Sequence, residues 1–155
     1  MTTGITVRPI GHVRGGRTAA MDDGWDRETA SIELDALRFT ADALLGLDAF
    51  SHIEVLFHFD RVPESDVIPG SRHPRGNPAW PRIGIFAQRG KDRPNRLGIT
   101  VCRLLGVEGT VLKVNGLDAI DGTPVLDIKP YMKGFAPRDA VREPSWAAEL
   151  MREYW

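Results

Sequence analysis

Apolar and polar residues alternate most regularly in residues 50–59. A period of two residues is typical of a β-strand that turns one face to a core and the other to solvent. The pattern therefore predicts one strand here, with its inner face in the core of the domain. The predicted inner face holds Ile53, Val55, Phe57 and Phe59, and the outer face holds His52, Glu54, Leu56 and His58.

Six further short runs are rich in β-branched residues and are bounded by Gly, Pro, Asn or Asp, which favour turns. Many short strands with frequent turns are typical of small barrels rather than helical bundles. The sequence thus predicts a mainly β fold, a small β-barrel of about seven or eight strands. The further predicted strands are residues 5–13, 31–34, 82–86, 99–107, 111–114 and 124–128.

Two helices are expected in addition to the strands. Thr40 can cap a short helix that reaches Leu45, and Ser145, which follows Pro144, can cap a C-terminal helix. In the second helix an apolar stripe at four-residue spacing is expected to pack against the body of the domain. The stripe consists of Trp146, Leu150 and Tyr154, with Ala147 and Met151 beside it.

Length and cysteine content limit the class of protein. The 155 residues, 42% hydrophobic and 26% charged, predict a single barrel domain over residues 1–155 with no additional C-terminal domain. Cys102 is the single cysteine, which excludes an internal disulfide and a zinc site built on paired cysteines. No signal sequence and no apolar run of about 18 residues is visible, so we expect a cytoplasmic protein that binds no membrane.

A metal site on the predicted strand 50–59 is excluded by distance. His52 and His58 fall on the same strand face, where histidines could suggest ligation. Six residues of strand separate them by about 20 Å, which is too far for one ion. We therefore expect no bound metal.

Charge is unevenly distributed, although the formal net charge is only −1. Residues 61–103 hold nine Arg and Lys against three Asp and Glu, a local net charge of +6. Eight of the nine are arginines, whose planar guanidinium suits carboxylates and phosphates, so an anionic ligand is indicated. The alternative is that these cations form surface ion pairs with the acidic N-terminal third. The long irregular stretches 11–27 and 61–81 are expected near the active face.

The densest special chemistry lies in residues 84–98, where a strand end leads into a tight loop and back into a strand. Pro94 biases Arg93 toward extended backbone, and Asn95 and Gly98 tolerate a positive φ. Such a loop can turn amides and guanidinium groups toward one anion. An ordinary charged hairpin is the alternative.

A second polar motif lies in residues 115–131. Asp121 and Gly122 form a hairpin-turn signal, and Asp127 and Lys129 share one face of the strand that follows. These two side chains can form one polar site. The alternative is an ion pair on an exposed strand.

Three ordered blocks of the sequence resemble the signature of the TsaA/TrmO-like family. They are Phe50-Ser51-His52-Ile53-Glu54-Val55, the stretch from Gly84 to Gly98 with Arg93-Pro94-Asn95, and Gly116 to Tyr131 with Leu126-Asp127-Ile128-Lys129-Pro130-Tyr131. The resemblance implies a small β-barrel that uses S-adenosylmethionine to methylate an adenine N6 beside the tRNA anticodon, and it implies a homodimer. The loop departs from the family at Gly90-Lys91-Asp92 and at Arg96, and no Pro-Arg-Gln element occurs in residues 11–27.

The resemblance also implies which residues form the site. The donor's carboxylate suits arginines, its sulfonium an aromatic face, and its adenine an apolar slot. A small-molecule methyltransferase and a non-catalytic RNA- or nucleotide-binding barrel are the alternatives, and Trp80 can stack on RNA or pack beneath its loop. The expected cofactor-binding residues are Phe86, Arg89, Arg93, Pro94, Asn95, Leu97, Gly98, Asp127 and Lys129; the expected catalytic residues are Asp127 and Tyr131; and the expected substrate-binding residues are Arg72, Arg75, Trp80 and Lys91.

Overall fold

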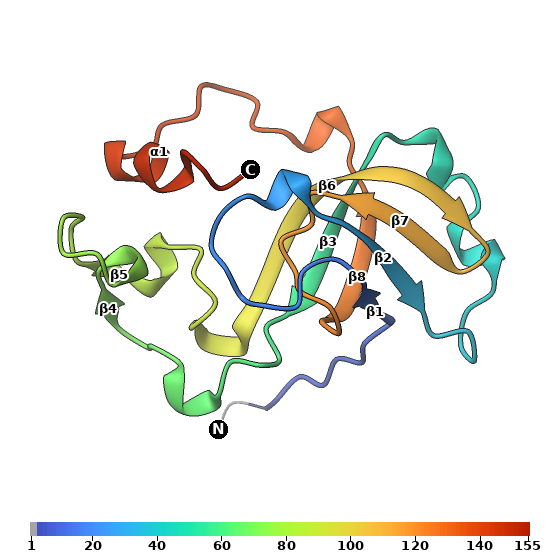
Figure 1. Cartoon of the computed structure of the whole chain (residues 1–155), viewed down its shortest axis with the longest axis horizontal. Coiled ribbons are helices and arrows are strands. Elements are labelled where there is room, and N and C mark those ends of the chain that lie inside the picture. The colour runs from blue at the N-terminus through green and yellow to red at the C-terminus, as the bar shows by residue number, and fades with distance from the viewer. Residues whose placement is uncertain (1–2) are drawn as a thin grey trace.

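The computed structural model describes residues 3–155, and its centre is a closed barrel of six antiparallel strands (Figure 1). Around the barrel the strands follow the order β1-β2-β7-β6-β3-β8. Closure pairs the backbone of neighbouring strands and leaves few edges open to solvent. The strands are β1 (Gly11–Arg14), β2 (Thr29–Leu34), β3 (His52–His58), β6 (Leu97–Glu108), β7 (Val111–Asn115) and β8 (Pro124–Pro130).

The predicted mainly β fold and small barrel are confirmed, but the predicted barrel count of seven or eight strands is wrong. Two further strands, β4 (Ser71–Arg72) and β5 (Ile83–Gly84), pair only with each other in a separate sheet. The predicted strand 82–86 shortens because Ile85–Ala87 winds into a 3-10 turn. The predicted strand 5–13 begins only at Gly11, after Pro9, which has no N–H to offer a neighbouring strand.

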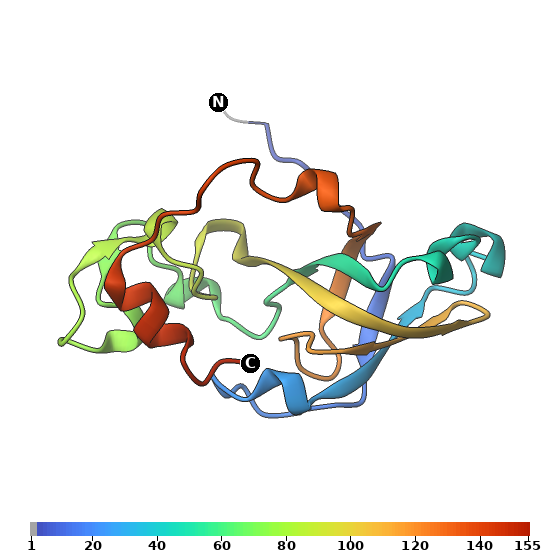
Figure 2. The same ribbon diagram turned by 90° about the horizontal axis from the view of Figure 1, so that it is seen from above.

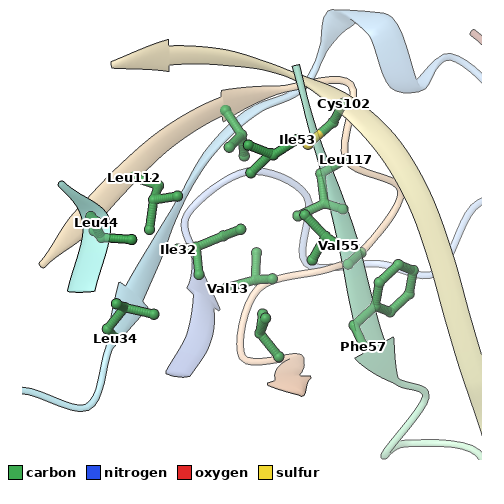
Figure 3. Close-up of a cluster of buried hydrophobic side chains, with 13 residues drawn as sticks. Val13, Ile32, Leu34, Leu44, Ile53, Val55, Phe57, Cys102, Leu112 and Leu117 are labelled. Carbon is green, nitrogen blue, oxygen red and sulfur yellow. The ribbon is translucent and has the colours of Figure 1, made fainter. Parts of the chain in front are cut away.

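Alternate residues of the barrel strands fill its interior, as the period-two pattern predicts (Figure 3). On β3, Ile53, Val55 and Phe57 are buried, and Phe59 lies half-buried just beyond the strand. Removing each such side chain from water contributes about 1.5–3 kcal/mol to folding. A six-stranded barrel has room for these side chains alone, so a ligand must bind outside the core. The buried cluster is Val13, Ile32, Leu34, Leu44, Ile53, Val55, Phe57, Cys102, Leu112, Val114, Leu117, Ala119 and Val125.

Strand β6 changes partner along its length. Residues from Leu97 to Arg103 pair with β3, whereas residues from Arg103 to Glu108 pair with β7. The first half of β6 therefore has a neighbour on one side only. Figure 1 shows this half as the margin of the barrel that faces α1, β4 and β5.

The connection between β7 and β8 contains the predicted turn at Asp121 and Gly122 but is not a hairpin. Gly122 has a φ of 87°, and its N–H donates to the carbonyl of Val13 on β1. Strand β8 pairs with β1 and β3, not with β7. The prediction of a hairpin was wrong because local turn chemistry does not determine which strand the chain then joins.

Helical structure is sparse. The one α-helix among residues 3–155 is α1 (Ser145–Met151), so the predicted C-terminal helix is confirmed, but Ser145 is its first residue and Pro144 occupies the N-cap position. The short helix predicted from Thr40 is a 3-10 turn without a side-chain cap. No helix in residues 3–155 is long and apolar enough to cross a bilayer. The 3-10 turns are Trp25–Arg27, Ala41–Leu44, Leu47–Ala49, Glu64–Asp66, Pro74–Gly76, Ile85–Ala87, Pro94–Arg96 and Lys133–Phe135.

Strands β4 and β5, the loops around them and α1 lie together beside the barrel, and both views show this group apart from it (Figure 2). Gln88 is buried in the group, where its Nε2 donates to the carbonyls of Arg72 and Ile83 at 3.2 and 3.0 Å. Trp80 Nε1 donates to Glu149 of α1 at 2.8 Å. We call this group, residues 60–96 with α1, the side lobe.

Candidate functional site

A groove of about 1860 Å³ separates the side lobe from the barrel. Pockets for one small molecule usually measure about 300–1,000 Å³, so this groove has room for a small ligand and part of a larger partner. Both long irregular stretches of the sequence contribute to it, and the expectation that they lie near the active face stays a prediction. Its lining includes Met21, Asp22 and Trp25 from the first stretch, Arg61, Arg72 and Arg75 from the second, residues 86–94, residues 97–101 of β6, and Trp146, Leu150 and Tyr154 of the C-terminal segment.

The loop predicted to carry the chemistry forms one wall of the groove. Asn95 has a φ of 64°, which confirms the predicted left-handed backbone at this position. Arg93 extends back into the loop, where its Nη1 donates to the carbonyl of Gln88 at 2.8 Å. Phe86 is 76% exposed at the groove, an unusual position for a large aromatic ring. The loop thus presents an aromatic face beside guanidinium groups.

Gly98 serves a different purpose from the one predicted. Its φ is not among the positive values of the chain, so the expected left-handed backbone is absent. A Cβ at this position would lie 2.5 Å from the ring of Phe57 and 2.9 Å from that of Phe59. Gly98 is therefore required for the close approach of two rings that form an edge-to-face pair.

The cations of residues 61–103 mostly lack carboxylate partners. Arg72 pairs with Asp92 at 2.8 Å, and Arg75 with Asp23 at 2.9 Å. Within residues 3–155 the other seven have no carboxylate oxygen within 4.0 Å. The alternative, pairing with the acidic N-terminal third, therefore holds for Arg75 alone, since Asp92 lies within residues 61–103 itself. Four of the seven, Arg61, Arg89, Arg93 and Arg96, donate to backbone carbonyls instead, and such bonds neutralise no charge.

A buried hydrogen-bond network closes the barrel side of the groove. Asp118 accepts hydrogen bonds from the Thr100 hydroxyl and from the Tyr154 hydroxyl. Burial and then the charge of Asp118 raise the pKa of Tyr154 well above its usual range, so the phenol remains a donor. Burial, followed by the charge of Asp118, also raises the pKa of Cys102 to about 12.

Sequence reasoning missed this network and the part that the C-terminal apolar stripe plays in the groove. Trp146, Leu150 and Tyr154 are expected to pack on the body of the domain; Tyr154 does contact the barrel, through Asp118 and Trp25, whereas all three residues also line the groove and α1 has no buried residue. Asp118 was visible inside the motif 115–131, but nothing in the sequence indicates its partners, because Tyr154 follows it by 36 residues. A stripe with a tyrosine in it is the one signal that could have suggested a functional surface.

The structure brings together nine of the predicted site residues. All of them line the groove: Phe86, Arg89, Arg93, Pro94, Leu97, Gly98, Arg72, Arg75 and Lys91. Asn95 shapes the turn but does not line the groove, and Trp80 is bonded to Glu149 in the side lobe. The roles assigned to these residues stay predictions.

Asp127, Lys129 and Tyr131 lie elsewhere within one chain. Strand β3 separates β8 from β6, and the groove lining contains none of the three residues. Asp127 Oδ2 is 3.1 Å from Lys129 Nζ, the ion pair that the alternative interpretation of this motif predicted. Alternation along β8 places these residues on the outward face, and across β3 Asp127 aligns with Leu56, which aligns in turn with Ile99 of β6. A single chain therefore does not bring the two predicted halves of the site into one cavity.

Acidic, histidine and cysteine side chains do not converge on a metal site. Between residues 3 and 155 no three of them are grouped closely enough to hold an ion.

A closed six-stranded barrel with a groove beside it defines a small β-barrel domain. Its family follows from the sequence: residues 21–136 match the tRNA-methyltransferase O N-terminal domain, and the chain belongs to this family.

Relatives and solved structures agree with this assignment. The tRNA (adenine(37)-N6)-methyltransferase of Escherichia coli is 45% identical over 98 residues, which cover 59% of this chain and 40% of that protein. A putative S-adenosylmethionine-dependent methyltransferase of Pseudomonas aeruginosa, RcsF, is 37% identical over 134 residues, 82% of this chain and 55% of that protein. A crystal structure of TrmO from P. aeruginosa superposes with a TM-score of 0.76 at 30% identity, over 94% of this chain and 63% of that one. The chain thus spans less than two thirds of each of these relatives.

Proposed function

We propose that the protein is an S-adenosylmethionine-dependent methyltransferase that modifies an adenine N6 in the anticodon loop of tRNA. The observation that carries the proposal is the groove: a space of about 1860 Å³ whose lining combines unpaired cations with exposed aromatic and aliphatic side chains. Membership of the tRNA-methyltransferase O family supports the reaction type.

The residues of the groove fit a methyl donor of this kind. Arg89 and Arg93 offer guanidinium groups for its carboxylate, and Phe86 offers an aromatic face for its cationic sulfur. Leu97 and Ile99 provide apolar surface beside them. The donor, when bound, supplies an activated methyl group on a sulfonium.

The chain's part in such a transfer is to position the reactants and exclude water. Holding an amine in line with a methyl group contributes up to about 7–11 kcal/mol in favourable cases, without a nucleophile from the protein. Lys91, which has no carboxylate partner among residues 3–155, flanks the groove as a site for a tRNA phosphate, whereas Arg75 would have to give up its pairing with Asp23 to bind one. Arg72, bonded to Asp92, supports the same wall.

We also propose that the working form is a homodimer, in which Asp127 and Tyr131 of one copy complete the site of the other. Four exposed apolar side chains follow one face of β6, which is the face that continues across β3 to Asp127 and Lys129. A row of this kind on a strand is unusual for a monomer surface and suits a second copy. In that arrangement Asp127 would orient the acceptor amine or hold its proton. The four residues are Leu97, Ile99, Val101 and Leu105.

Leu105→Glu tests the dimer without touching the groove, because Leu105 is 50% exposed and is absent from the groove lining. A charge at this position would lose its hydration in a subunit interface, so the variant is expected to be monomeric. Light scattering after gel filtration measures the mass, and Leu37→Glu, at an exposed site outside the groove and outside the β6 row, is the matched control. A wild-type chain that elutes as a monomer of 17.2 kDa would exclude the dimer.

A cytoplasmic location is proposed because the acceptor tRNA is found there. Fractionation of cells that express the tagged protein measures it, and recovery with membranes or in the medium would contradict it.

The reaction is tested by incubation with methyl-labelled S-adenosylmethionine, separately with total tRNA and with a small-metabolite extract. Label in the tRNA, recovered as N6-methylated adenine nucleoside after digestion, is the expected result. Label confined to the extract would show a small-molecule methyltransferase instead. Binding of RNA without any transfer would show a non-catalytic barrel.

A further inference from the structure

The first half of β6 presents an open strand edge inside the groove. Residues from Leu97 to Arg103 pair with β3 on one side, and β7 joins the other side only at Arg103. All five residues from Leu97 to Val101 line the groove, those pointing inward and those pointing outward alike. Side chains on opposite faces of a strand can line the same groove only where the groove runs along the strand's edge.

The register shows which backbone groups face that edge. The carbonyl of Arg96 accepts from Phe59 N–H, and Leu104 N–H donates to the carbonyl of Ser51, so even-numbered residues direct their polar groups toward β3. In an antiparallel pair, successive residues alternate between the two sides. Leu97, Ile99 and Val101 therefore direct N–H and C=O away from β3, into the groove.

Val101 is the free position on this edge. The carbonyl of Ile99 is occupied, since Arg89 Nη2 donates to it at 2.8 Å. Within residues 3–155 neither the N–H nor the carbonyl of Val101 has a hydrogen-bond partner on the groove side. An unpaired strand edge is a liability that proteins usually cover, and here it is left open where a ligand is expected.

We infer that Val101 is an adenine-binding position, at which its backbone N–H donates to ring N1 of the base and its carbonyl accepts from the exocyclic amine. The N–H and the C=O of one strand residue point to the same side of the strand. Adenine has a matching pair side by side, since its ring N1 accepts a hydrogen bond and its exocyclic amine donates one. The inference rests on the proposed function, which supplies two sources of the base: the adenosine of the methyl donor and the acceptor nucleotide.

The two isosteric ring analogues of S-adenosylhomocysteine test this inference by calorimetry. Replacing N1 by C–H leaves the Val101 N–H unsatisfied on binding, so the 1-deaza analogue is expected to bind at least about tenfold more weakly. The 7-deaza analogue changes an atom on the other edge of the base and is the matched control, with affinity unchanged. Equal affinity for S-adenosylhomocysteine and both analogues would show that the Val101 N–H does not bind N1 of the donor's adenine.

Nuclear magnetic resonance of the chain labelled with ¹⁵N-valine distinguishes the two sources. A downfield move of the Val101 amide on addition of S-adenosylhomocysteine, with the buried Val125 amide unmoved, assigns the edge to the donor. If the Val101 amide signal moves only after an anticodon stem-loop is added as well, the strand edge binds the adenine of the acceptor nucleotide. If S-adenosylhomocysteine binds and Val101 moves in neither titration, the inference fails while the proposed function survives. If S-adenosylhomocysteine does not bind at all, both fail.

A pair of variants tests the same point from the protein side. Proline is tolerated on a strand edge where the N–H makes no ladder bond, so Val101→Pro removes the donor and keeps the strand. The expected result is affinity for S-adenosylhomocysteine about tenfold or more below that of Val101→Ala, the reference variant that also lacks the valine side chain but keeps the backbone N–H. Circular dichroism checks the fold, and the analogue titrations decide the question if Val101→Pro fails to fold.

Discussion

Single residues around Asp118 show how much of this site depends on contacts between distant parts of the chain. Thr100, Asp118 and Tyr154 come from a strand, a loop and the C-terminal segment, and one carboxylate joins all three. The sequence shows each residue but none of the pairings, because no local spacing connects them. By contrast, the positive φ of Asn95 was predictable, since it depends on the residue itself and its neighbour Pro94.

Cys102 gives a prediction of pH dependence at this scale. Its thiol keeps its proton to about pH 12 in the folded chain, whereas an unfolded chain loses it near 9.0. Above pH 9 the folded state thus binds more protons, and its stability should fall by about 1.4 kcal/mol per pH unit until about pH 12. Below pH 9 this contribution is fully present. Chemical denaturation from pH 8 to 11 measures it.

The control for this experiment is Cys102→Ala, which removes the titrating group. Tyr154, whose pKa is also raised, remains in both proteins, so only the difference between the two pH profiles reports on the thiol. Parallel profiles for the wild type and Cys102→Ala would refute the assigned pKa.

At the scale of elements, β6 was predicted well and its surroundings were not. The β-branched run between turn-favouring residues predicted residues 99–107 as a strand, and the structure extends it to Leu97–Glu108. Periodicity determines which side chains of a strand point inward, but it carries no information about its neighbours. The change of partner at Arg103, and with it the open edge in the groove, follows from the closure of the whole barrel.

Gly98→Ala is the prediction that belongs to β6. The added Cβ meets the rings of Phe57 and Phe59, and overpacking of this kind costs about 1–3 kcal/mol. Gly106→Ala in the same strand has no atom within 4 Å of the new Cβ and serves as the control. Urea denaturation is expected to show a loss for Gly98→Ala alone. An equal effect at both positions would contradict the packing role of Gly98.

At the scale of the whole molecule, charge is unevenly distributed although its net value is only −1. Its negative charge is spread over both ends of the sequence, and six of the nine cations of residues 61–103 line the groove together with six carboxylates. The local excess was readable from the sequence. The position of six of these cations along one groove depends on the packing of the side lobe beside the barrel, and Figures 1 and 2 show how these two parts are arranged.

Lys91→Ala tests this charge distribution through its effect on tRNA binding. Lys91 lines the groove and forms no ion pair within the described chain, so it is available for one phosphate. Affinity for tRNA should fall, and the slope of log affinity against log salt should decrease by about one. Lys113→Ala, exposed on β7 outside the groove, should change neither quantity. An unchanged slope in Lys91→Ala would remove this residue from the RNA-binding surface.

The most direct test of the account is a calorimetric titration of S-adenosylmethionine into the wild type, Arg89→Ala and Arg82→Ala. Both variants lose one arginine, but only Arg89 lines the groove, whereas Arg82 is exposed in the side lobe and bonds to Ser71. The account predicts one saturable site per chain, a clear loss of affinity in Arg89→Ala, and binding by Arg82→Ala that matches the wild type. No saturable heat, or equal affinity in all three proteins, would contradict the groove as the methyl-donor site.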